Sequence, residues 1–282
     1  MILKDNYVIN GRHQKPILID TLASGNKSNL PVVIFCHGYK GFKDWGAWNL
    51  MGEAFAKAGF FFLKFNFSHN GGTVRQPIDF PDLEAFAENN YTKELDDLET
   101  VIDWLFENKN LQSKVNLENL SLIGHSRGGG IVVIKAEEDR RIKQVISLAS
   151  VSDFGKRMTA SGDLEQWKKS GVKYVLNGRT KQQMPHHYQF YEDFKANEER
   201  FTIERAVAYL KIPHLIIHGD ADPSVSIEES EKLHQWNPDS TFMVVKGADH
   251  VFNTKHPWDK NSLSNELAEV VVTITNFINK NT

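Results

Sequence analysis

The stretch 120–130 (LSLIGHSRGGG) constrains the fold of this chain more than any other. It combines a short apolar run with a glycine-rich turn, and a second apolar run follows at 131–136. A short apolar run bounded by glycine is typical of a strand buried on both faces, and the second run suits a buried helix. The spacing Gly124-x-Ser126-x-Gly128 therefore predicts a sharp turn from a strand into a helix that begins at about Ser126.

That turn gives Ser126 an unusual chemical position. A serine at the top of such a turn has a strained backbone, and side chains two residues before and after it would collide. Glycine at 124 and 128 removes the collision and leaves the Ser126 hydroxyl clear of the sheet. The Arg127 N–H then lies at a helix N-terminus, where it can stabilise an oxyanion. A glycine-rich turn whose serine has no catalytic role would show the same pattern, so residues elsewhere in the chain must distinguish the two interpretations.

Strand and helix patterns alternate along the chain. This alternation predicts a mostly parallel central sheet of about eight strands, flanked by helices, with right-handed crossovers and ligands beyond the carboxyl ends of the strands. The first two strands form a hairpin at Asn10-Gly11. The expected strands are 6–10, 14–22, 31–36, 60–67, 115–124, 144–149, 212–218 and 241–246, and the main helices are 48–58, 91–108, 227–236 and 262–279.

Residues 151–209 interrupt this alternation. The interval is too long for an ordinary crossover, so we expect a lid-like insertion in a core domain formed by 1–150 and 210–282. Within it, strands at 172–176 and 179–184 form a hairpin, and a helix follows at 186–197. The insertion is rich in aromatic residues, which either wall a substrate pocket or form a small core of their own. The aromatic residues are Phe154, Trp167, Tyr174, His187, Tyr188, Phe190 and Phe194, and Met184 adds a further large apolar side chain.

Composition excludes several classes of protein. The net charge of −3 and the hydrophobic content of 40% indicate neither a nucleic-acid surface nor disorder. The sequence contains no run of about 18 apolar residues, so we expect no membrane span. Its first residues lack the pattern of a secretory signal, so we do not expect export. The single cysteine, Cys36, cannot form an internal disulfide and is expected in the core. A cytoplasmic location follows, and the oligomeric state stays open, a homo-oligomer included.

Two further loops carry chemically suggestive residues. The segment 37–45 follows a buried strand, and its glycines suit a bend that turns main-chain amides toward Ser126. Tyr39 is the expected second oxyanion donor, although a glycine turn leading into the next helix would show the same pattern. His69 is expected to be structural, and Glu94, Asp96, Asp97 and Glu99 are expected to form a solvated face rather than a metal site.

An aspartate and a histidine follow the last two strands, so that Ser126, Asp222 and His250 occur in that order. This order is that of the α/β-hydrolase triad. With the segments His218-Gly219-x-x-Asp222-x-x-Val225 and Gly247-x-x-His250, the chain resembles the α/β-hydrolase superfamily, in its esterase and serine aminopeptidase-like (acyl-peptidase-like) branch. Asp220 and Asp153 are alternative acids, and Asp249 stands where relatives usually have glycine.

The resemblance implies a catalytic triad of Ser126, Asp222 and His250, an oxyanion hole formed by the Tyr39 and Arg127 N–H groups, and no cofactor or metal. It implies a carboxylesterase-like enzyme that cleaves small to medium acyl esters through an acyl-enzyme. The alternatives are a serine peptidase acting on short peptides, with Glu192, Asp193 or Asp153 as the anchor for an amino group, and a non-catalytic binding protein.

Overall fold

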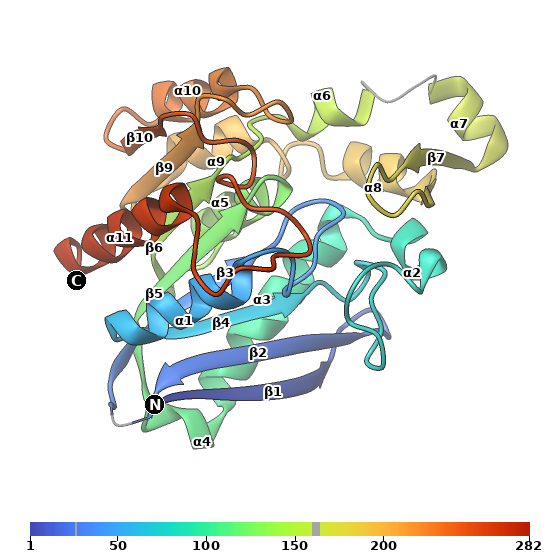
Figure 1. The fold of residues 1–282 in the computed structure, drawn as a ribbon. Helices are drawn as coiled ribbons and strands as arrows, with labels where there is room; N and C mark the ends of the chain where they lie inside the picture. Colours follow the sequence, from blue (N-terminus) through green and yellow to red (C-terminus); the bar gives the residue numbers. More distant parts are fainter. Residues whose placement is uncertain (26, 160–163) are drawn as a thin grey trace.

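The computed structural model describes residues 1–25, 27–159 and 164–282. Within them, an eight-stranded sheet has the order β1-β2-β4-β3-β5-β6-β9-β10 (Figure 1). Strand β1 pairs antiparallel with β2, β2 pairs antiparallel with β4, and the other neighbours are parallel. The mostly parallel sheet is therefore confirmed. Its strands are β1 Ile2–Asn10, β2 Pro16–Ser24, β3 Leu30–Cys36, β4 Phe61–Asn66, β5 Val115–His125, β6 Ile142–Leu148, β9 His214–Gly219 and β10 Thr241–Val245.

Helices cover both faces of the sheet. On one face α1 (Trp48–Ala58) contacts α11 (Asn265–Lys280), and on the other α5 (Arg127–Glu138) contacts α3 (Tyr91–Glu107) and α9 (Ile203–Tyr209). The sheet has a hydrophobic core on each face, and successive residues of a strand point to opposite faces. In β3, Ile34 lies in the core under α5 and Val33 lies in the core under α1, as expected for a strand buried on both sides. The remaining helices outside 151–209 are α2 Leu83–Ala87, α4 Lys109–Gln112 and α10 Ile227–Trp236.

Most predicted bounds agree with the structure to within a few residues, and two differences have clear causes. Strand β1 begins at Ile2 rather than at residue 6, because it is an edge strand in which Lys4, Asp5 and Asn6 are exposed, and this polar run hides the strand pattern at its start. Helix α11 begins at Asn265 rather than 262, because the Ser264 hydroxyl accepts a hydrogen bond from the Leu267 N–H (3.1 Å) and caps the helix there.

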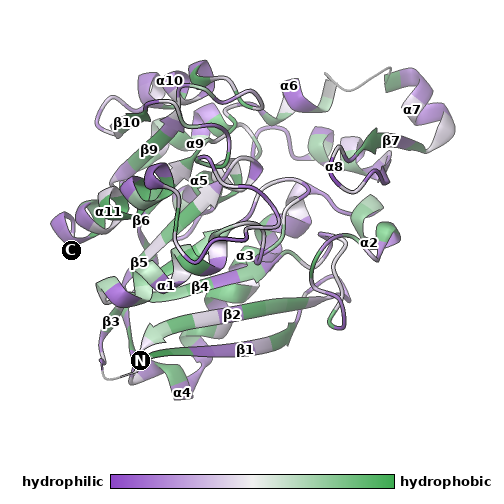
Figure 2. Cartoon of the chain, in the orientation of Figure 1, coloured by the Kyte–Doolittle hydropathy of each residue, from purple (hydrophilic) through white to green (hydrophobic). Residues whose placement is uncertain are grey.

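The segment between β6 and β9 contains α6 (Phe154–Thr159), α7 (Leu164–Ser170), β7 (Val172–Leu176), β8 (Gln183–His187), α8 (Gln189–Ala196) and α9. Strands β7 and β8 form a separate two-stranded sheet, and α7 and β7 lie to one side of the central sheet (Figure 1). Helix α7 is mainly hydrophilic, in contrast to β4 (Figure 2). Residues 160–163 of the expected insertion lie outside the described residues, and the division into core and lid stays a prediction.

The predicted hairpin in this segment needs one correction. Strand β7 has its predicted bounds, but β8 occupies Gln183–His187 instead of 179–184, and His186 and His187 therefore belong to a strand and not to a helix. The turn is longer than two residues because the Asn177 side chain accepts a hydrogen bond from the Arg179 N–H (3.1 Å), and the Asn177 N–H donates to the Gln182 carbonyl (2.8 Å).

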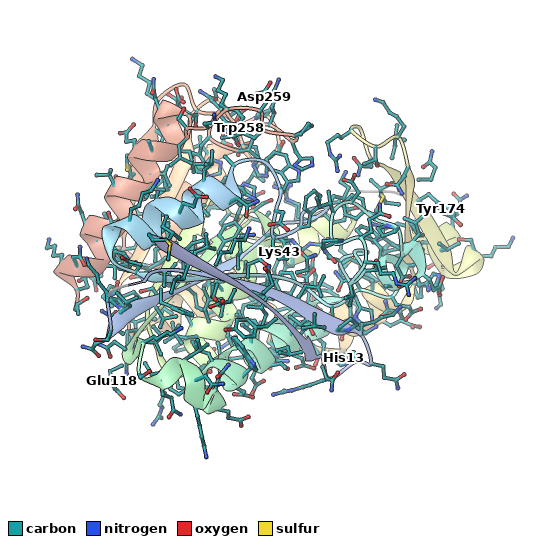
Figure 3. All side chains as sticks on the ribbon, turned by 60° about the horizontal axis from the view of Figure 1, so that its bottom comes forward. His13, Lys43, Glu118, Tyr174, Trp258 and Asp259 are labelled. Carbon is teal, nitrogen blue, oxygen red and sulfur yellow. The ribbon has the colours of Figure 1, made fainter. Side chains whose placement is uncertain are left out.

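A buried ion-pair network holds the loop after β3. Lys64 on β4 contacts Asp20 on β2 at 2.7 Å, and Lys43 in the loop contacts the same carboxylate at 2.8 Å. Asp44 completes the network by pairing with both lysines. Lys43 is buried, and it lies near the centre of the view in Figure 3. Because buried charges are stable only when they are paired, this network fixes the path of the loop.

Cys36 is a free, fully buried thiol at the end of β3, which confirms its expected place in the core. Among the described helices, none is both long enough and apolar enough to cross a bilayer.

Candidate active site

Ser126 lies in the turn between β5 and α5, with φ of 56° and ψ of −119°. A Cβ at Gly124 would lie 2.2 Å from the Gly128 carbonyl oxygen, and a Cβ at Gly128 would lie 2.6 Å from the Cys36 carbonyl oxygen. Both distances are far below van der Waals contact, so no other residue fits at either position without moving the backbone. The predicted strained turn is therefore present, for the predicted reason.

Asp222 follows β9 and His250 follows β10, and the two side chains are hydrogen-bonded. His250 Nδ1 lies 2.7 Å from Asp222 Oδ2, and Asp222 Oδ1 accepts the backbone N–H groups of Ser224 (2.7 Å) and Val225 (3.0 Å). Burial raises the pKa of Asp222, but hydrogen bonds from His218 and His250 outweigh it and hold the pKa well below its usual range. The carboxylate is therefore ionised at neutral pH and fixes the His250 ring.

His218 is a second histidine on the same carboxylate. Its Nε2 donates to Asp222 Oδ2 (3.1 Å) and to the Val225 carbonyl (2.9 Å), while Nδ1 lies 2.6 Å from Ser230 Oγ. The ring is completely buried. The sequence motif contains His218, but its spacing does not reveal that this ring orients Asp222.

His125 orients His250 from the other side. Its Nε2 donates to the His250 carbonyl oxygen at 2.8 Å, and the two ring centroids lie 4.7 Å apart. Burial, and secondly the charge of His250, lowers the pKa of His125 to about 3, so the ring is neutral. Sequence reasoning missed this role because the contact joins residues that are far apart in the chain.

Ser126 and His250 line the same cavity, but Ser126 Oγ and the His250 ring, both within the described residues, form no hydrogen bond. Catalytic hydrogen bonds are often long without substrate and shorten in the substrate complex. The structure thus brings the three predicted triad residues to one place, with the Asp222–His250 contact already formed.

The alternative acids have other partners. The Asp220 side chain accepts a hydrogen bond from the Gly247 N–H (2.5 Å), and the Asp153 side chain accepts one from the Lys156 N–H (2.9 Å). Asp249 bonds the Asn253 N–H (2.7 Å) and so shapes its own loop. Of these aspartates, none is bonded to the His250 ring, whose carboxylate partner among the described residues is Asp222.

The loop after β3 passes directly beside Ser126. A Cβ at Gly38 would lie 2.9 Å from Ser126 Cβ, so only glycine allows this approach. His37 holds the bend, because its Nδ1 donates to the Gly38 carbonyl (2.9 Å) and its Nε2 accepts the Phe67 N–H (3.4 Å). Burial lowers the pKa of His37 to about 4, which keeps it neutral and suited to both bonds.

Two backbone amides near Ser126 are available to a ligand. None of the described residues accepts a hydrogen bond from the Tyr39 N–H or from the Arg127 N–H. Tyr39 follows Gly38, and Arg127 is the first residue of α5. These are the two amides that the sequence suggested, and their use as an oxyanion hole stays a proposal.

The Arg127 side chain has a role that the sequence did not predict. Its guanidinium lies 3.2 Å from Glu94 Oε1 and 4.4 Å from the centroid of the Tyr39 ring. Glu94 and Asp97 are buried, so the expected solvated face on α3 is wrong for these two residues. Glu94 is buried because α3 lies against α5 and places it beside Arg127, a partner with opposite charge.

Ser126 and Tyr39 lie between two cavities. Cavity A has a volume of about 220 Å³ and cavity B of about 400 Å³, and both residues line each of them. Cavity B also contains His250, whereas cavity A is formed largely by the segment 151–209. The further residues of cavity A are Tyr91, Arg127, Val151, Phe154, Arg157, Met158, Lys173, Val175, His186 and Phe190.

Some aromatic residues of the segment 151–209 line a cavity and others form a small core, so both alternatives that the sequence left open occur. Phe154 and Phe190 line cavity A. Trp167 instead packs against Tyr188, with centroids 5.6 Å apart, and Tyr174 is 61% exposed at the outer margin of the molecule (Figure 3). The segment is therefore partly a cavity wall and partly a small core of its own.

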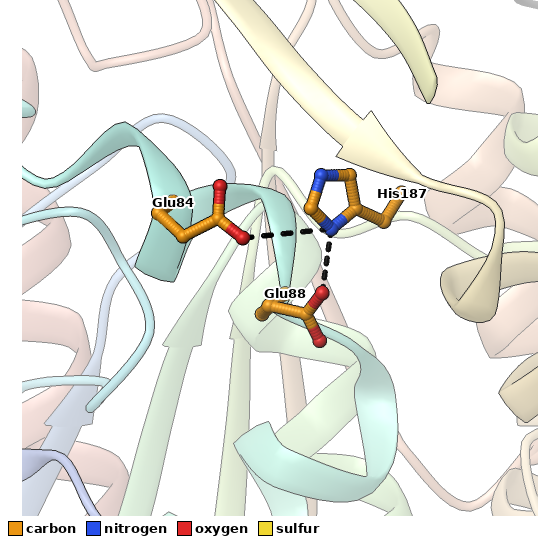
Figure 4. Close-up of side chains that lie close together, drawn as sticks. All are labelled: Glu84, Glu88 and His187. Atoms are coloured by element: carbon orange, nitrogen blue, oxygen red, sulfur yellow. Dashed lines mark hydrogen bonds and ion pairs between the residues drawn. The ribbon is translucent and has the colours of Figure 1, made fainter. Parts of the chain in front are cut away.

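One group of side chains has the composition of a metal site. Glu84, Glu88 and His187 place one ligand atom each within 4.8 Å of one another (Figure 4). His187 Nδ1 lies 2.5 Å from Glu88 Oε1, and Lys93 Nζ lies 3.7 Å from the other Glu88 oxygen. Glu88 already contacts Lys93 and is hydrogen-bonded to His187, so the group joins α2 to β8 through contacts within the protein, and it lines neither cavity A nor cavity B.

The mostly parallel sheet, with Ser126, Asp222 and His250 in loops beyond the carboxyl ends of its strands, defines the class of protein: it has the α/β-hydrolase fold. The sequence profile of the BD-FAE family matches residues 21–237, and the chain belongs to this family.

Solved structures share the fold at low sequence identity. Est1E from Butyrivibrio proteoclasticus is 18% identical with a TM-score of 0.72, and 98% of each chain is covered. The esterase domain of a Rhodothermus marinus protein is 18% identical with a TM-score of 0.64, covering 99% of this chain and 98% of that one. A puromycin-hydrolysing peptidase of Mycobacterium tuberculosis is 15% identical with a TM-score of 0.66, covering 99% of this chain and 39% of that one. No curated protein matches the chain.

Proposed function

We propose that the protein is a serine hydrolase that cleaves carboxylic esters with small to medium acyl groups through an acyl-enzyme on Ser126. The main observation is the hydrogen bond of 2.7 Å between His250 and the ionised Asp222, beside a cavity that His250 shares with Ser126. The similar fold of an esterase domain, and of Est1E, which has also been solved with ferulic acid bound, supports this choice.

The proposed reaction begins when His250 Nε2 takes the Ser126 proton and Oγ attacks the ester carbonyl. Asp222 holds the ring in the tautomer that exposes Nε2 and stabilises the imidazolium. His250 then gives its proton to the leaving alcohol as the ester C–O bond breaks. A water molecule, deprotonated by the same histidine, hydrolyses the acyl-enzyme and restores Ser126. No cofactor is required.

The oxyanion of each tetrahedral intermediate is proposed to accept hydrogen bonds from the Tyr39 and Arg127 N–H groups. Neither amide has a hydrogen-bond acceptor among the described residues. Tyr39 follows Gly38, which packs against Ser126, and Arg127 follows Ser126 in the chain. Pre-oriented donors of this kind each contribute on the order of 3 kcal/mol to lowering the barrier.

The two cavities suggest how the ester is oriented. The leaving alcohol must lie near His250, which protonates it, and His250 lines cavity B but not cavity A. The acyl group therefore occupies cavity A. The volume of about 220 Å³ is below the ~300–1,000 Å³ of typical ligand pockets, which favours short acyl chains.

A serine peptidase is the second candidate, and the fold shared with a peptidase is the observation in its favour. An aminopeptidase needs an anion to bind the substrate's amino group. Among the described lining residues of both cavities there is no carboxylate. Asp193 is engaged with the Thr92 hydroxyl at 2.5 Å, and neither Glu192 nor Asp153 lines cavity A or cavity B. Esters are therefore the preferred substrate class.

Hydrolysis of p-nitrophenyl acetate, butyrate and octanoate tests this proposal. The wild type should cleave at least the short esters, and Ser126→Ala and His250→Ala should lower kcat by orders of magnitude, with Asp222→Asn reducing it by up to ~10⁴-fold. A wild type that cleaves none of them, or an unimpaired Ser126→Ala, overturns the esterase proposal. Aminoacyl p-nitroanilides then test the peptidase alternative, and inactivity on both supports a binding role.

A further inference from the structure

Cavity A has a positively charged wall. Arg127 on α5, Arg157 on α6 and Lys173 on β7 all line it, together with apolar residues, and no carboxylate lies among its described lining residues. Three cations from three separate elements therefore converge on the space proposed for the acyl group.

The counter-ions of the two arginines lie outside the cavity. Arg127 pairs with Glu94 (3.2 Å) and Arg157 with Glu229 (3.0 Å), and neither glutamate lines cavity A. Glu229 is also held from behind, because its other oxygen accepts the Ser152 N–H (2.7 Å) and hydroxyl (2.9 Å). The glutamates thus fix the guanidinium groups without filling the cavity.

Lys173 contributes a third charge in a different way. Its Nζ lies 3.6 Å from the centroid of the Trp167 ring, and the Trp167 Nε1–H is itself bonded to the His186 carbonyl (2.8 Å). Burial, and secondly the charge of Arg127, lowers the pKa of Lys173 to about 8. The ammonium is therefore mainly protonated at pH 7, and an anion nearby would stabilise its charge.

We propose that cavity A selects acyl groups with a carboxylate at their far end, so that the preferred substrates are half-esters of short dicarboxylic acids. This inference rests on the proposed esterase function and names its substrate class. Phe154, Met158 and Val175 provide an apolar wall for the methylene chain, and Lys173 and Arg157 are the charges proposed to bind the carboxylate. Water adds hydroxyl to the acyl carbon and a proton to the alcohol, giving a dicarboxylate.

Two esters that differ in one group test this selectivity. The p-nitrophenyl half-ester of adipic acid carries a terminal carboxylate, and its primary-amide analogue has the same shape without the charge. At pH 7 the wild type should have a kcat/KM at least ten-fold higher for the carboxylate. An equal or lower kcat/KM for the carboxylate overturns the inference, and if the amide is still cleaved in a Ser126-dependent way the esterase proposal stands.

Variants locate the selectivity in the cavity. Lys173→Met and Arg157→Gln should each lower the ratio of the two kcat/KM values several-fold, and Lys169→Met, an exposed lysine of α7, should leave the ratio unchanged. The ratio is measured on one protein sample, so it does not depend on how much of a variant is folded. A ratio unaffected by both cavity variants contradicts the assignment of these residues.

Binding provides a readout that does not require catalysis. Calorimetric titration of Ser126→Ala with adipate and with its uncharged diamide should show tighter binding of adipate, and Lys173→Met in the same background should reduce the difference. If no ester is cleaved by the wild type, the esterase function fails, and this titration still decides the preference of the cavity. If adipate binds no more tightly than the diamide, the proposed preference of cavity A for a carboxylate is overturned.

Discussion

At the scale of single residues, Tyr39 contributes two different groups to the site. Its backbone N–H lies in the loop that passes Ser126, and its hydroxyl donates to His186 Nε2 at 2.7 Å. Burial lowers the pKa of His186 to about 3, so this ring is a neutral acceptor. Since the hydroxyl is already bonded to a strand of the segment 151–209, the proposed catalytic contribution of Tyr39 comes from its amide.

Tyr39→Phe separates these two groups. The substitution keeps the amide and removes one hydrogen bond, which contributes about 1 kcal/mol to stability. We expect kcat for p-nitrophenyl butyrate to fall less than about ten-fold in steady-state kinetics. A loss of ~10² to 10³, the size expected for removal of an oxyanion donor, would instead assign the donor role to the hydroxyl.

The sequence predicts the backbone of the site better than its side-chain contacts. The glycines at 124 and 128 and the order of Ser126, Asp222 and His250 depend on local spacing, which can be read directly. The bonds that His125 and His218 make to His250 and Asp222 depend on how loops after different strands meet. No local pattern encodes that meeting.

At the scale of elements, α3 shows where periodicity is not enough. Leu95, Leu98 and Leu105 face the core as predicted, but Asp97 is also buried. Its Oδ2 accepts the Ser68 N–H at 2.7 Å, so the carboxylate caps the loop after β4. The hydrophobic pattern marks the apolar face of a helix, but it cannot show which loop covers the margin of that face.

The burial of Asp97 predicts a pH-dependent stability. Burial raises the pKa of Asp97 to about 7, more than the Ser68 hydrogen bonds lower it, and the unfolded value is about 3.9. The folded state therefore holds a proton that the unfolded state has lost, and this group makes the free energy of unfolding fall as pH rises from about 4 to 7. The change is on the order of 4 kcal/mol.

Asp97→Asn removes this titration and keeps an acceptor for the Ser68 N–H. In urea denaturation the variant should gain stability relative to the wild type as pH rises from 4 to 7, and the difference should stay constant above pH 8. Two stability profiles that run parallel over this range would show that Asp97 is ionised in the folded protein.

The bounds of the other elements were predicted correctly where the sequence pattern is strong and incorrectly where it is weak. Helices α1 and α10 have their predicted bounds, because apolar periodicity and a clear end signal coincide there. Strand β8 was misplaced because a side-chain bond of Asn177 lengthens the turn. Such a bond is one of several that an Asn-Gly pair can make, and the sequence does not choose among them.

At the scale of the whole molecule, the parallel sheet determines where the chemistry lies. The loops with Tyr39, Ser126, Asp222 and His250 follow β3, β5, β9 and β10, so they gather at one edge of the sheet. The alternation of strands and helices predicts this gathering. The charge of cavity A could not be predicted in the same way, because its cations come from α5, α6 and β7, whose relative placement is a property of the folded chain.

The central claim is that Ser126 is a nucleophile activated by His250, and covalent labelling tests it most directly. The wild type is treated with a fluorophosphonate and analysed by intact mass and peptide mapping. We predict one adduct on the peptide that contains Ser126, none in Ser126→Ala, and labelling slowed by orders of magnitude in His250→Ala. No adduct, or an adduct on another residue that persists in Ser126→Ala, would contradict the claim.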